Sequence, residues 1–219
     1  MAGRPVLAAL RALGLGDFLV AVPALRALAR AHPGHRLVLL GPASLAPLVR
    51  LLDGWEPAPL EGKAGLDPGA PLPLAGPVDV AVNLHGRGPR SHALLRRLSP
   101  RRLIAFAHPD VPGTQGLPPW VPDEVITSHE RERWCGLLRS CGIDADAADL
   151  ALPRPALPAP VGGDDVTLIH VGAAGMSRRW PLERWAAVAD TERRNGRRVY
   201  LTGSAAERPD ALVVARWSG

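Results

Sequence analysis

The sequence is poor in aromatic residues and cysteine, and each shortage narrows the range of possible functions. Aromatic residues make up 4% of the 219 residues, too few for the stacking platforms that bind single-stranded nucleic acids. Cys135 and Cys141 are six residues apart in an expected helix, so they point to different faces and cannot pair with each other. No metal-ligand spacing surrounds them. We therefore expect two free thiols in a reducing compartment.

Long apolar runs are also missing. No segment reaches the length of a transmembrane helix without a charge or a proline. Near the N-terminus, Arg11 and Asp17 interrupt the apolar run and no small-residue cleavage site follows, which argues against a signal peptide. The net charge of +5 is compatible with phosphate-bearing partners but does not require nucleic acid. We expect a cytoplasmic protein.

The first two thirds of the chain alternate between apolar runs of strand length and segments with helical spacing. The expected strands are 5–12, 36–42, 78–85 and 102–108, and the expected helices are 23–32, 44–52, 90–98 and 128–142. Pro23 either kinks its helix or lies in the first turn. The Pro/Gly-rich stretch that runs through residue 77 is expected to be a loop. This alternation predicts a doubly wound α/β domain over residues 1–149, with a parallel sheet covered on both faces.

Residues 150–165 alternate proline with small apolar residues, which predicts a stiff linker. After it, residues 166–219 contain one further βαβα pattern. Its expected strands are 166–172 and 197–204, and its expected helices are 181–195 and 205–217. Because two strands make a poor sheet by themselves, we expect an incomplete second domain.

A Gly-x-Gly turn follows the first expected strand, but it does not match a phosphate-binding loop. The dinucleotide fingerprint needs a small residue where this chain has Leu19, and no G-K-[ST] follows. Asp17, directly after Gly16, would repel a pyrophosphate. Two interpretations of Asp17 remain open. It caps the first helix, or it lies in the ligand crevice of the sheet and takes a proton from a substrate hydroxyl.

A second candidate site is the stretch 170–185, in which a glycine-rich turn with Gly172 and Ala173 precedes Ser177 and two arginines. Backbone amides, a helix N-terminus and the guanidinium groups of Arg178 and Arg179 all favour an anion such as a diphosphate. In the alternative interpretation these arginines are solvated surface charges. Trp180 and Trp185 are expected to be packing residues.

A third candidate is the end of the strand 78–85. His85, Arg87 and Arg90 follow one another closely there, and all three can face the same crevice of the first domain. A structural or solvated role for the histidine is the alternative. The chain has no metal-ligand spacing and no G-x-S-x-G nucleophile turn.

Four segments, in this order, resemble the ADP-heptose:lipopolysaccharide heptosyltransferases, also called glycosyltransferase family 9. They are "LGLGDFLVAVPALRALARAHPGHRLVLLGP", "VDVAVNLHG", "SHERERWCGLLRSCGID" and "LIHVGAAGMSRRWPLERWAAVADTERRNGRRVYLTGSAAE". Together they cover most of the chain. The resemblance implies a GT-B-like α/β fold, in which two Rossmann-like domains face each other across a cleft. No metal and no bound cofactor are expected.

The resemblance also implies roles for individual residues. Asp17 stands where the family has the base that activates the acceptor hydroxyl. Arg178 occupies the basic position before x-W-P that lies against the diphosphate of the donor, and Glu207 matches an acidic position that contacts the nucleoside. Gly172, Ala173 and Ser177 complete the expected donor-binding set. On the acceptor side we place Gly16, His85, Arg87 and Arg90, although the two residues His85 and Arg87 match no family position that we can assign.

The implied reaction is an inverting sugar transfer from a nucleotide-diphosphate donor to a lipopolysaccharide-type or other cell-envelope glycan. We expect a cytoplasmic monomer that works at the inner face of the membrane. The chain ends at Gly219, before the D-x-G-x-x-H segment of the family, so we expect little or no transfer by the chain alone. The alternative is a catalytically inactive binding module of the same fold. A nucleotide-binding oxidoreductase is opposed by the failed fingerprint and by Asp17.

Overall fold

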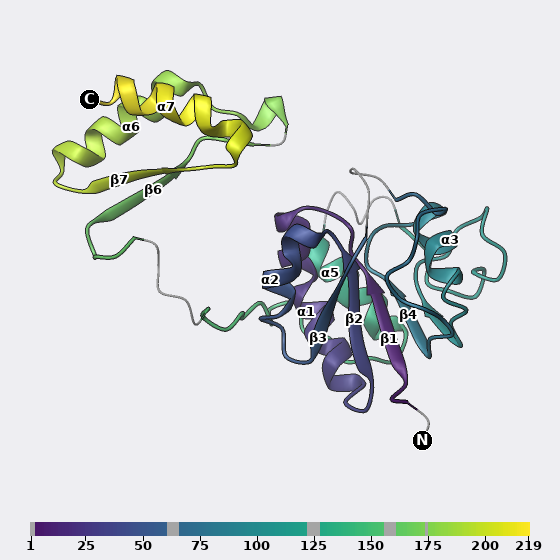
Figure 1. Cartoon of the computed structure of the whole chain (residues 1–219). Coiled ribbons are helices and arrows are strands. Elements are labelled where there is room, and N and C mark those ends of the chain that lie inside the picture. The colour runs from purple at the N-terminus through teal and green to yellow at the C-terminus, as the bar shows by residue number, and fades with distance from the viewer. Residues whose placement is uncertain (1–2, 61–65, 122–127, 156–160, 174) are drawn as a thin grey trace. The chain divides into compact units, whose positions relative to one another are not determined.

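The structure is a computed structural model that describes residues 3–60, 66–121, 128–155, 161–173 and 175–219. The chain forms two compact units, Met1–Pro155 and Ala156–Gly219, which we call unit 1 and unit 2 and describe separately (Figure 1). The division between them falls within the proline-rich stretch 150–165.

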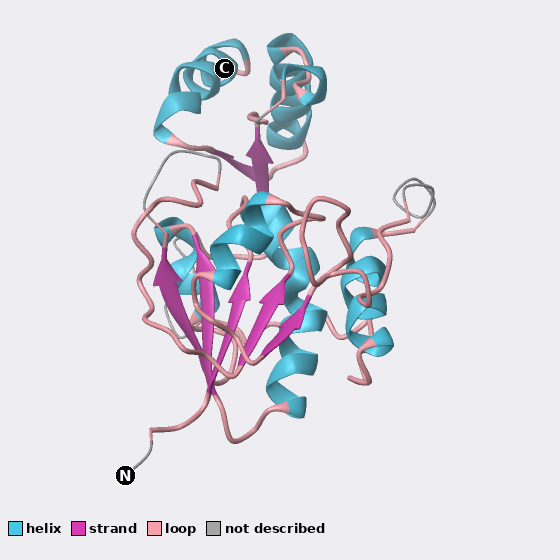
Figure 2. Ribbon diagram, turned by 90° about the vertical axis from the view of Figure 1, so that its right-hand side faces the viewer, coloured by secondary structure: helices cyan, strands magenta, loops and turns pink. Residues whose placement is uncertain are grey.

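Unit 1 is built on a five-stranded parallel sheet with the strand order β3-β2-β1-β4-β5. The strands are β1 (Val6–Leu10), β2 (Arg36–Gly41), β3 (Trp55–Pro59), β4 (Val80–Asn83) and β5 (Arg102–Ile104). Leu7 in the central strand pairs with Leu37 on one side and with Val80 on the other. Figure 2 shows the five strands side by side, all pointing the same way. The chain therefore reverses its winding direction at β1, where β4 begins the second half of the sheet.

Helices cover both faces of this sheet because successive strand residues point to opposite sides. They are α1 (Leu15–Ala31), α2 (Ala46–Val49), α3 (Arg90–Arg96) and α5 (Glu130–Ser140), with a 3-10 turn, η1 (Ala43–Leu45), before α2. Leu7 and Ala9 pack into the core under α1 and α5, whereas Ala8 and Leu10 pack into the core under α3 (Figure 1). The predicted doubly wound α/β arrangement is confirmed. No helix among the described residues is long and apolar enough to cross a membrane.

Two features of unit 1 differ from the sequence prediction, and the first is β3. The stretch before residue 77 was expected to be a loop, yet Trp55–Pro59 forms a strand. Pro57 and Pro59 have no N–H to donate, but among the described strands β3 lies at the edge of the sheet and pairs with β2 alone, and proline is tolerated on an edge strand. Trp55 anchors the strand: it is buried, and its Nε1 donates to the main-chain oxygen of Leu25 at 3.2 Å.

The second difference is the start of α1. The helix begins at Leu15, eight residues before the predicted start, and Pro23 lies inside it rather than in its first turn. Burial of the apolar face around Pro23, including Phe18 and Leu25, offsets the hydrogen bond that the proline cannot make. As a result, Asp17 belongs to the first turn of α1 and not to a loop that precedes it.

The described residues of unit 2 form two parallel strands and two α-helices. They are β6 (Val166–His170), β7 (Arg198–Thr202), α6 (Leu182–Arg194) and α7 (Arg208–Trp217), with the 3-10 turns η2 (Met176–Arg178) and η3 (Ala205–Glu207). Both helices lie on one side of the strands (Figure 1), and a small core around Ile169, Ala186 and Val214 joins them. Leu168, which points away from that core, is 58% exposed. The apolar surface that this unit buries is therefore small.

The buried histidine of α3 makes the stability of unit 1 depend on pH. His92 is fully buried; its Nε2 donates to the main-chain oxygen of Phe106 at 2.9 Å, and burial lowers the pKa of its imidazole. The unfolded chain therefore binds more protons than the folded chain just below the ordinary histidine pKa of about 6.5. The stabilising contribution is complete above that value and is lost as the pH falls toward the lower folded pKa. Burial also lowers the pKa of His32 and His85, so their contributions to the stability of unit 1 are lost over the same pH range.

We expect the free energy of unfolding to fall on acidification from about pH 7.5 to about pH 5.5, a range above the one in which carboxylates titrate. Urea unfolding followed by circular dichroism measures it. His92→Gln should show a smaller slope over the same range. An equal slope in this variant would contradict the assignment to His92.

Candidate active site

The first turn of α1 holds Asp17 at the C-terminal end of β1. Gly14 precedes the helix, and its N–H donates to Asp17 Oδ2 at 3.2 Å, which is the backward half of a helix capping box. Negative charge in this turn is also favoured by the helix dipole. The capping interpretation of Asp17 therefore describes a real contact. The side chain is still 44% exposed, so it also keeps a face open to a ligand.

A buried arginine lies beneath this turn. Arg11 is 1% exposed, and its Nε donates to the main-chain oxygen of Asp17 at 2.8 Å. Its Nη1 donates to the main-chain oxygen of Leu84 at 2.6 Å, and its Nη2 donates to Glu130 Oε1 at 2.8 Å. The guanidinium also lies 5.1 Å from the ring centre of Trp134. One side chain thus ties together α1, the segment after β4 and the first turn of α5.

His85 lies next to Asp17 and Arg11, at the end of the neighbouring strand β4. Its Nδ1 accepts a hydrogen bond from the N–H of Ala12 at 3.2 Å, which assigns the ring hydrogen of the neutral imidazole to Nε2. Burial lowers the pKa of His85, and the nearby charge of Arg11 lowers it further, while Asp17 opposes the shift. The imidazole is therefore neutral at neutral pH and presents an N–H donor.

The loop after β4 is held by Asn83, which is fully buried. Its Nδ2 donates to the main-chain oxygen of Gly86 and to Ser91 Oγ, both at 2.9 Å, and its Oδ1 accepts from the N–H of His85 at 3.0 Å. This network fixes the position of His85. Arg87 is exposed and makes no hydrogen bond or ion pair with the residues that the structure describes.

The predicted acceptor-side residues therefore fall into two groups. Gly16 and His85 lie beside Asp17 at the C-terminal edge of β1 and β4, where doubly wound sheets bind ligands. Arg87 and Arg90 are both exposed, on the loop and at the start of α3.

In unit 2, the glycine-rich turn after β6 is packed against Glu207. A Cβ atom at Gly172 would overlap the carboxylate of Glu207, so only glycine fits there without a shift. Glu207 accepts hydrogen bonds from Ser204 N at 2.7 Å and from Ser204 Oγ at 2.8 Å, and these two bonds lower its pKa. The predicted donor-binding residues Gly172 and Glu207 are thus in contact.

The two arginines before Trp180 have different environments. Arg179 Nε donates to the main-chain oxygen of Ala173 at 3.0 Å, and its Nη1 lies 3.8 Å from Asp210 Oδ2, so it holds the turn in place. Arg178 and Ser177 are exposed in η2. The guanidinium of Arg178 forms no hydrogen bond or ion pair within the described part of the chain, so it is available to an anion.

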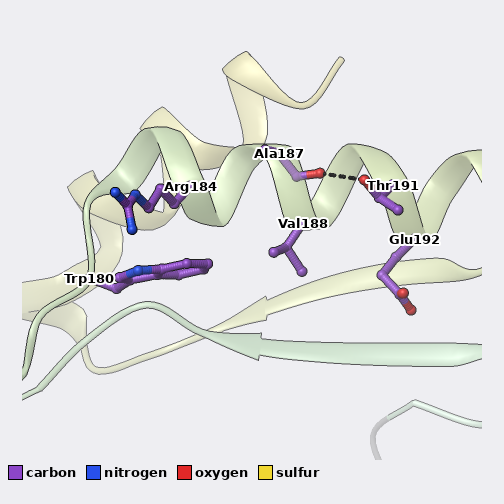
Figure 3. Close-up of a pocket in the computed structure, with 6 residues that line it drawn as sticks. All are labelled: Trp180, Arg184, Ala187, Val188, Thr191 and Glu192. Atoms are coloured by element: carbon purple, nitrogen blue, oxygen red, sulfur yellow. Dashed lines mark hydrogen bonds between the residues drawn. The ribbon is translucent and has the colours of Figure 1, made fainter.

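The two tryptophans of this region, which were expected to be packing residues, pack against each other. Their rings meet edge to face, with 4.8 Å between the centres. Trp180 remains 39% exposed and borders a hollow of about 450 Å³ along α6. Figure 3 shows that the hollow is lined by Trp180, Arg184, Ala187, Val188, Thr191 and Glu192.

Sequence reasoning missed three contributors to these sites. Arg11 lies three residues before Gly14 and interrupts the apolar run, which in the sequence indicates only that the run is not a signal peptide. Glu130 gave no local signal. Ser204 and Glu207 have the S-x-x-E spacing of a capping box, which is the one sequence signal that predicts their contact.

Comparison with known proteins gives matches at the level of structure. No protein-family model and no curated protein matches the sequence. A glycosyltransferase family 9 protein from Veillonella parvula matches with a TM-score of 0.69 at 16% identity, over 97% of this chain and 66% of its own. The ADP-heptose lipopolysaccharide heptosyltransferase II of E. coli matches with a TM-score of 0.67 at 18% identity, over 96% of this chain and 68% of its own.

A third match is the E. coli heptosyltransferase WaaC, solved with ADP-2-deoxy-2-fluoro heptose, with a TM-score of 0.56 at 16% identity. It covers 95% of this chain and 72% of its own length. The predicted GT-B-like α/β fold class is therefore confirmed. These solved structures belong to the same group of proteins that the sequence resembles. The chain spans about two thirds of their length.

Proposed function

We propose that this protein is a glycosyltransferase that moves a sugar from a nucleotide-diphosphate donor to a glycan acceptor. The observation that carries the proposal is the half-exposed carboxylate of Asp17, fixed at the ligand-binding edge of a heptosyltransferase-like fold. Similar structures named for ADP-heptose transfer or solved with ADP support a nucleotide sugar as the donor.

In the proposed reaction, Asp17 accepts the proton of an acceptor hydroxyl while the hydroxyl oxygen attacks the anomeric carbon of the donor sugar. The bond between that carbon and the diphosphate oxygen breaks, and the electron pair leaves with the nucleoside diphosphate. Attack from the opposite side inverts the anomeric centre. His85 supplies an Nε2–H that can bind an acceptor oxygen, because no described residue accepts from it.

The departing diphosphate gains negative charge, and unit 2 offers positive groups for it. Arg178 is exposed and unpaired within the described residues, and it follows the glycine-rich turn of Gly172 and Ala173. Main-chain N–H groups and an arginine stabilise such a leaving group without a metal ion. We assign Ser177 and Glu207 to the same donor site. The acceptor we propose is a lipopolysaccharide-type or other cell-envelope glycan.

The Arg178 assignment is tested by donor binding. Arg178→Gln should weaken binding of a nucleoside diphosphate about 10- to 100-fold, because a charge-assisted hydrogen bond is worth about 1.5–3 kcal/mol. Calorimetric titration of the chain measures the dissociation constant. Arg216→Gln, an exposed arginine of α7 in the same unit, is the charge-matched control and should bind as the wild type does. Equal losses in both variants would point to general charge rather than a site.

A binding module without catalysis is the second candidate, and the small core of unit 2 favours it. Leu168 is 58% exposed on a two-stranded sheet, so few packing contacts hold the donor site in place within the described residues of that unit. For the same reason we expect turnover by the chain to be slow. Binding of nucleoside diphosphate with no sugar transfer would favour the module. Binding of a nicotinamide dinucleotide instead would revive the oxidoreductase.

A further inference from the structure

We propose that Arg11 and Glu130 form a positioning pair for Asp17, in which Glu130 keeps the Arg11 guanidinium out of a close ion pair with the Asp17 carboxylate. The inference rests on the proposed function, in which that carboxylate accepts a proton.

The first step is the difference between two distances from one nitrogen. Arg11 Nη2 lies 2.8 Å from Glu130 Oε1 and 3.6 Å from Asp17 Oδ1. Only the first distance is within hydrogen-bond range. Arg11 instead holds Asp17 through its main-chain oxygen, which accepts from Nε at 2.8 Å. The arginine therefore fixes the backbone of Asp17, and with the carboxylate it makes only a longer ion pair without a hydrogen bond.

The second step is what holds Glu130 in this position. Its Oε1 also accepts a hydrogen bond from Trp134 Nε1 at 3.2 Å, one turn further along α5. The Trp134 ring in turn lies 5.1 Å from the Arg11 guanidinium, which is fully buried. Trp134 thus lies against the face of the Arg11 guanidinium, and Glu130 binds its Nη2. With Nη2 bound to Glu130 and the guanidinium against the Trp134 ring, Nη2 stays 3.6 Å from Asp17 Oδ1, beyond hydrogen-bond distance.

The third step is chemical. A carboxylate in a close pair with arginine holds a proton weakly and is a poor general base. A carboxylate without any fixed partner loses its orientation. Asp17 has an intermediate arrangement: Oδ2 accepts from Gly14 N–H, and Oδ1 lies near a positive charge that is already bonded elsewhere. Glu130 is then a positioning residue whose negative charge keeps Asp17 available to the acceptor.

The test is Glu130→Gln, which keeps the shape of the side chain and removes its charge. We expect a crystal structure of this variant to show Arg11 Nη2 within hydrogen-bond distance of Asp17 Oδ1. We also expect kcat for sugar transfer to fall about tenfold, while the dissociation constant for nucleoside diphosphate stays unchanged. Glu130→Asp, which restores the charge, should recover part of the lost kcat. The control is Glu132→Gln on the same helix. Glu132 pairs with Arg139 at 2.8 Å and not with Arg11.

The two measurements separate the failure of this inference from failure of the proposed function. If Nη2 stays on residue 130 and 3.6 Å from Asp17 Oδ1, the positioning role is wrong whether or not the chain transfers sugar. If the guanidinium moves to Asp17 but the wild-type chain transfers no sugar from any donor, the proposed function fails and the geometric inference holds. A loss of kcat that is equal in Glu130→Gln and Glu130→Asp would also overturn the role of the charge.

Discussion

Replacing Asp17 by asparagine is expected to lower the rate of sugar transfer by a factor of about 10² to 10⁴, which is the usual contribution of a general base. The amide has the shape of the carboxylate, and its oxygen can still accept from the N–H of Gly14. It cannot take up the proton of an acceptor hydroxyl. Because Arg178 and the glycine-rich turn lie on unit 2, the affinity for nucleoside diphosphate should not change. Transfer of a radiolabelled sugar and calorimetric titration measure the two quantities.

Asp67→Asn is a matched control for this experiment. Asp67 is an exposed aspartate of unit 1, and its Oδ1 accepts from the N–H of Gly69 at 2.8 Å, so it makes the same kind of contact as Asp17. This variant should transfer sugar at the wild-type rate. If Asp17→Asn also kept a near-normal rate, Asp17 would be a helix cap and not a base.

Arg11→Met is expected to reduce the free energy of unfolding by about 3–5 kcal/mol, because it removes a fully buried guanidinium and its three hydrogen bonds, each of which is worth about 1.5 kcal/mol. The side chain of Arg11 is fully buried, and the substitution removes the guanidinium donors to the main-chain oxygens of Asp17 and Leu84. It also leaves Glu130 without its counter-charge. Domains of this size are stable by only about 5–15 kcal/mol, so the loss would be a large share of the total. Urea unfolding followed by circular dichroism measures it.

Arg87→Met is the comparison for this prediction, because Arg87 is exposed and makes no hydrogen bond or ion pair with described residues. Surface substitutions of this kind change stability by no more than about 0.5 kcal/mol. A loss below about 1 kcal/mol for Arg11→Met would mean that the buried network contributes little beyond what a hydrophobic side chain supplies.

The sheet of unit 1 could be predicted because buried parallel strands are short apolar runs that alternate with helical segments. Four of its strands were found in this way. The fifth, β3, was missed because Pro57 and Pro59 are typical of loops, and nothing local shows that they lie on an edge strand. The start of α1 was missed for a related reason. Glycine and proline are disfavoured inside helices, but here burial of the apolar face of the helix outweighs that preference.

The candidate site could be predicted only where its residues are close in sequence. The position of Asp17 followed from the strand, the glycine turn and the resemblance to a known family. The contact between Arg11 and Glu130 joins residues 119 positions apart. No periodicity or spacing indicates such a pair, because the contact forms only when α5 packs beside α1 on the same face of the sheet.

The most direct test of the proposed function is the release of nucleoside diphosphate from a panel of nucleotide-activated sugars by the purified 219-residue chain. The reaction is measured with and without a lipid-linked cell-envelope glycan as acceptor. We predict slow release that depends on the acceptor, yields a product with inverted anomeric configuration and is lost in Asp17→Asn. Binding of the nucleoside diphosphate with no acceptor-dependent release from any donor would contradict a catalytic function and leave a binding module.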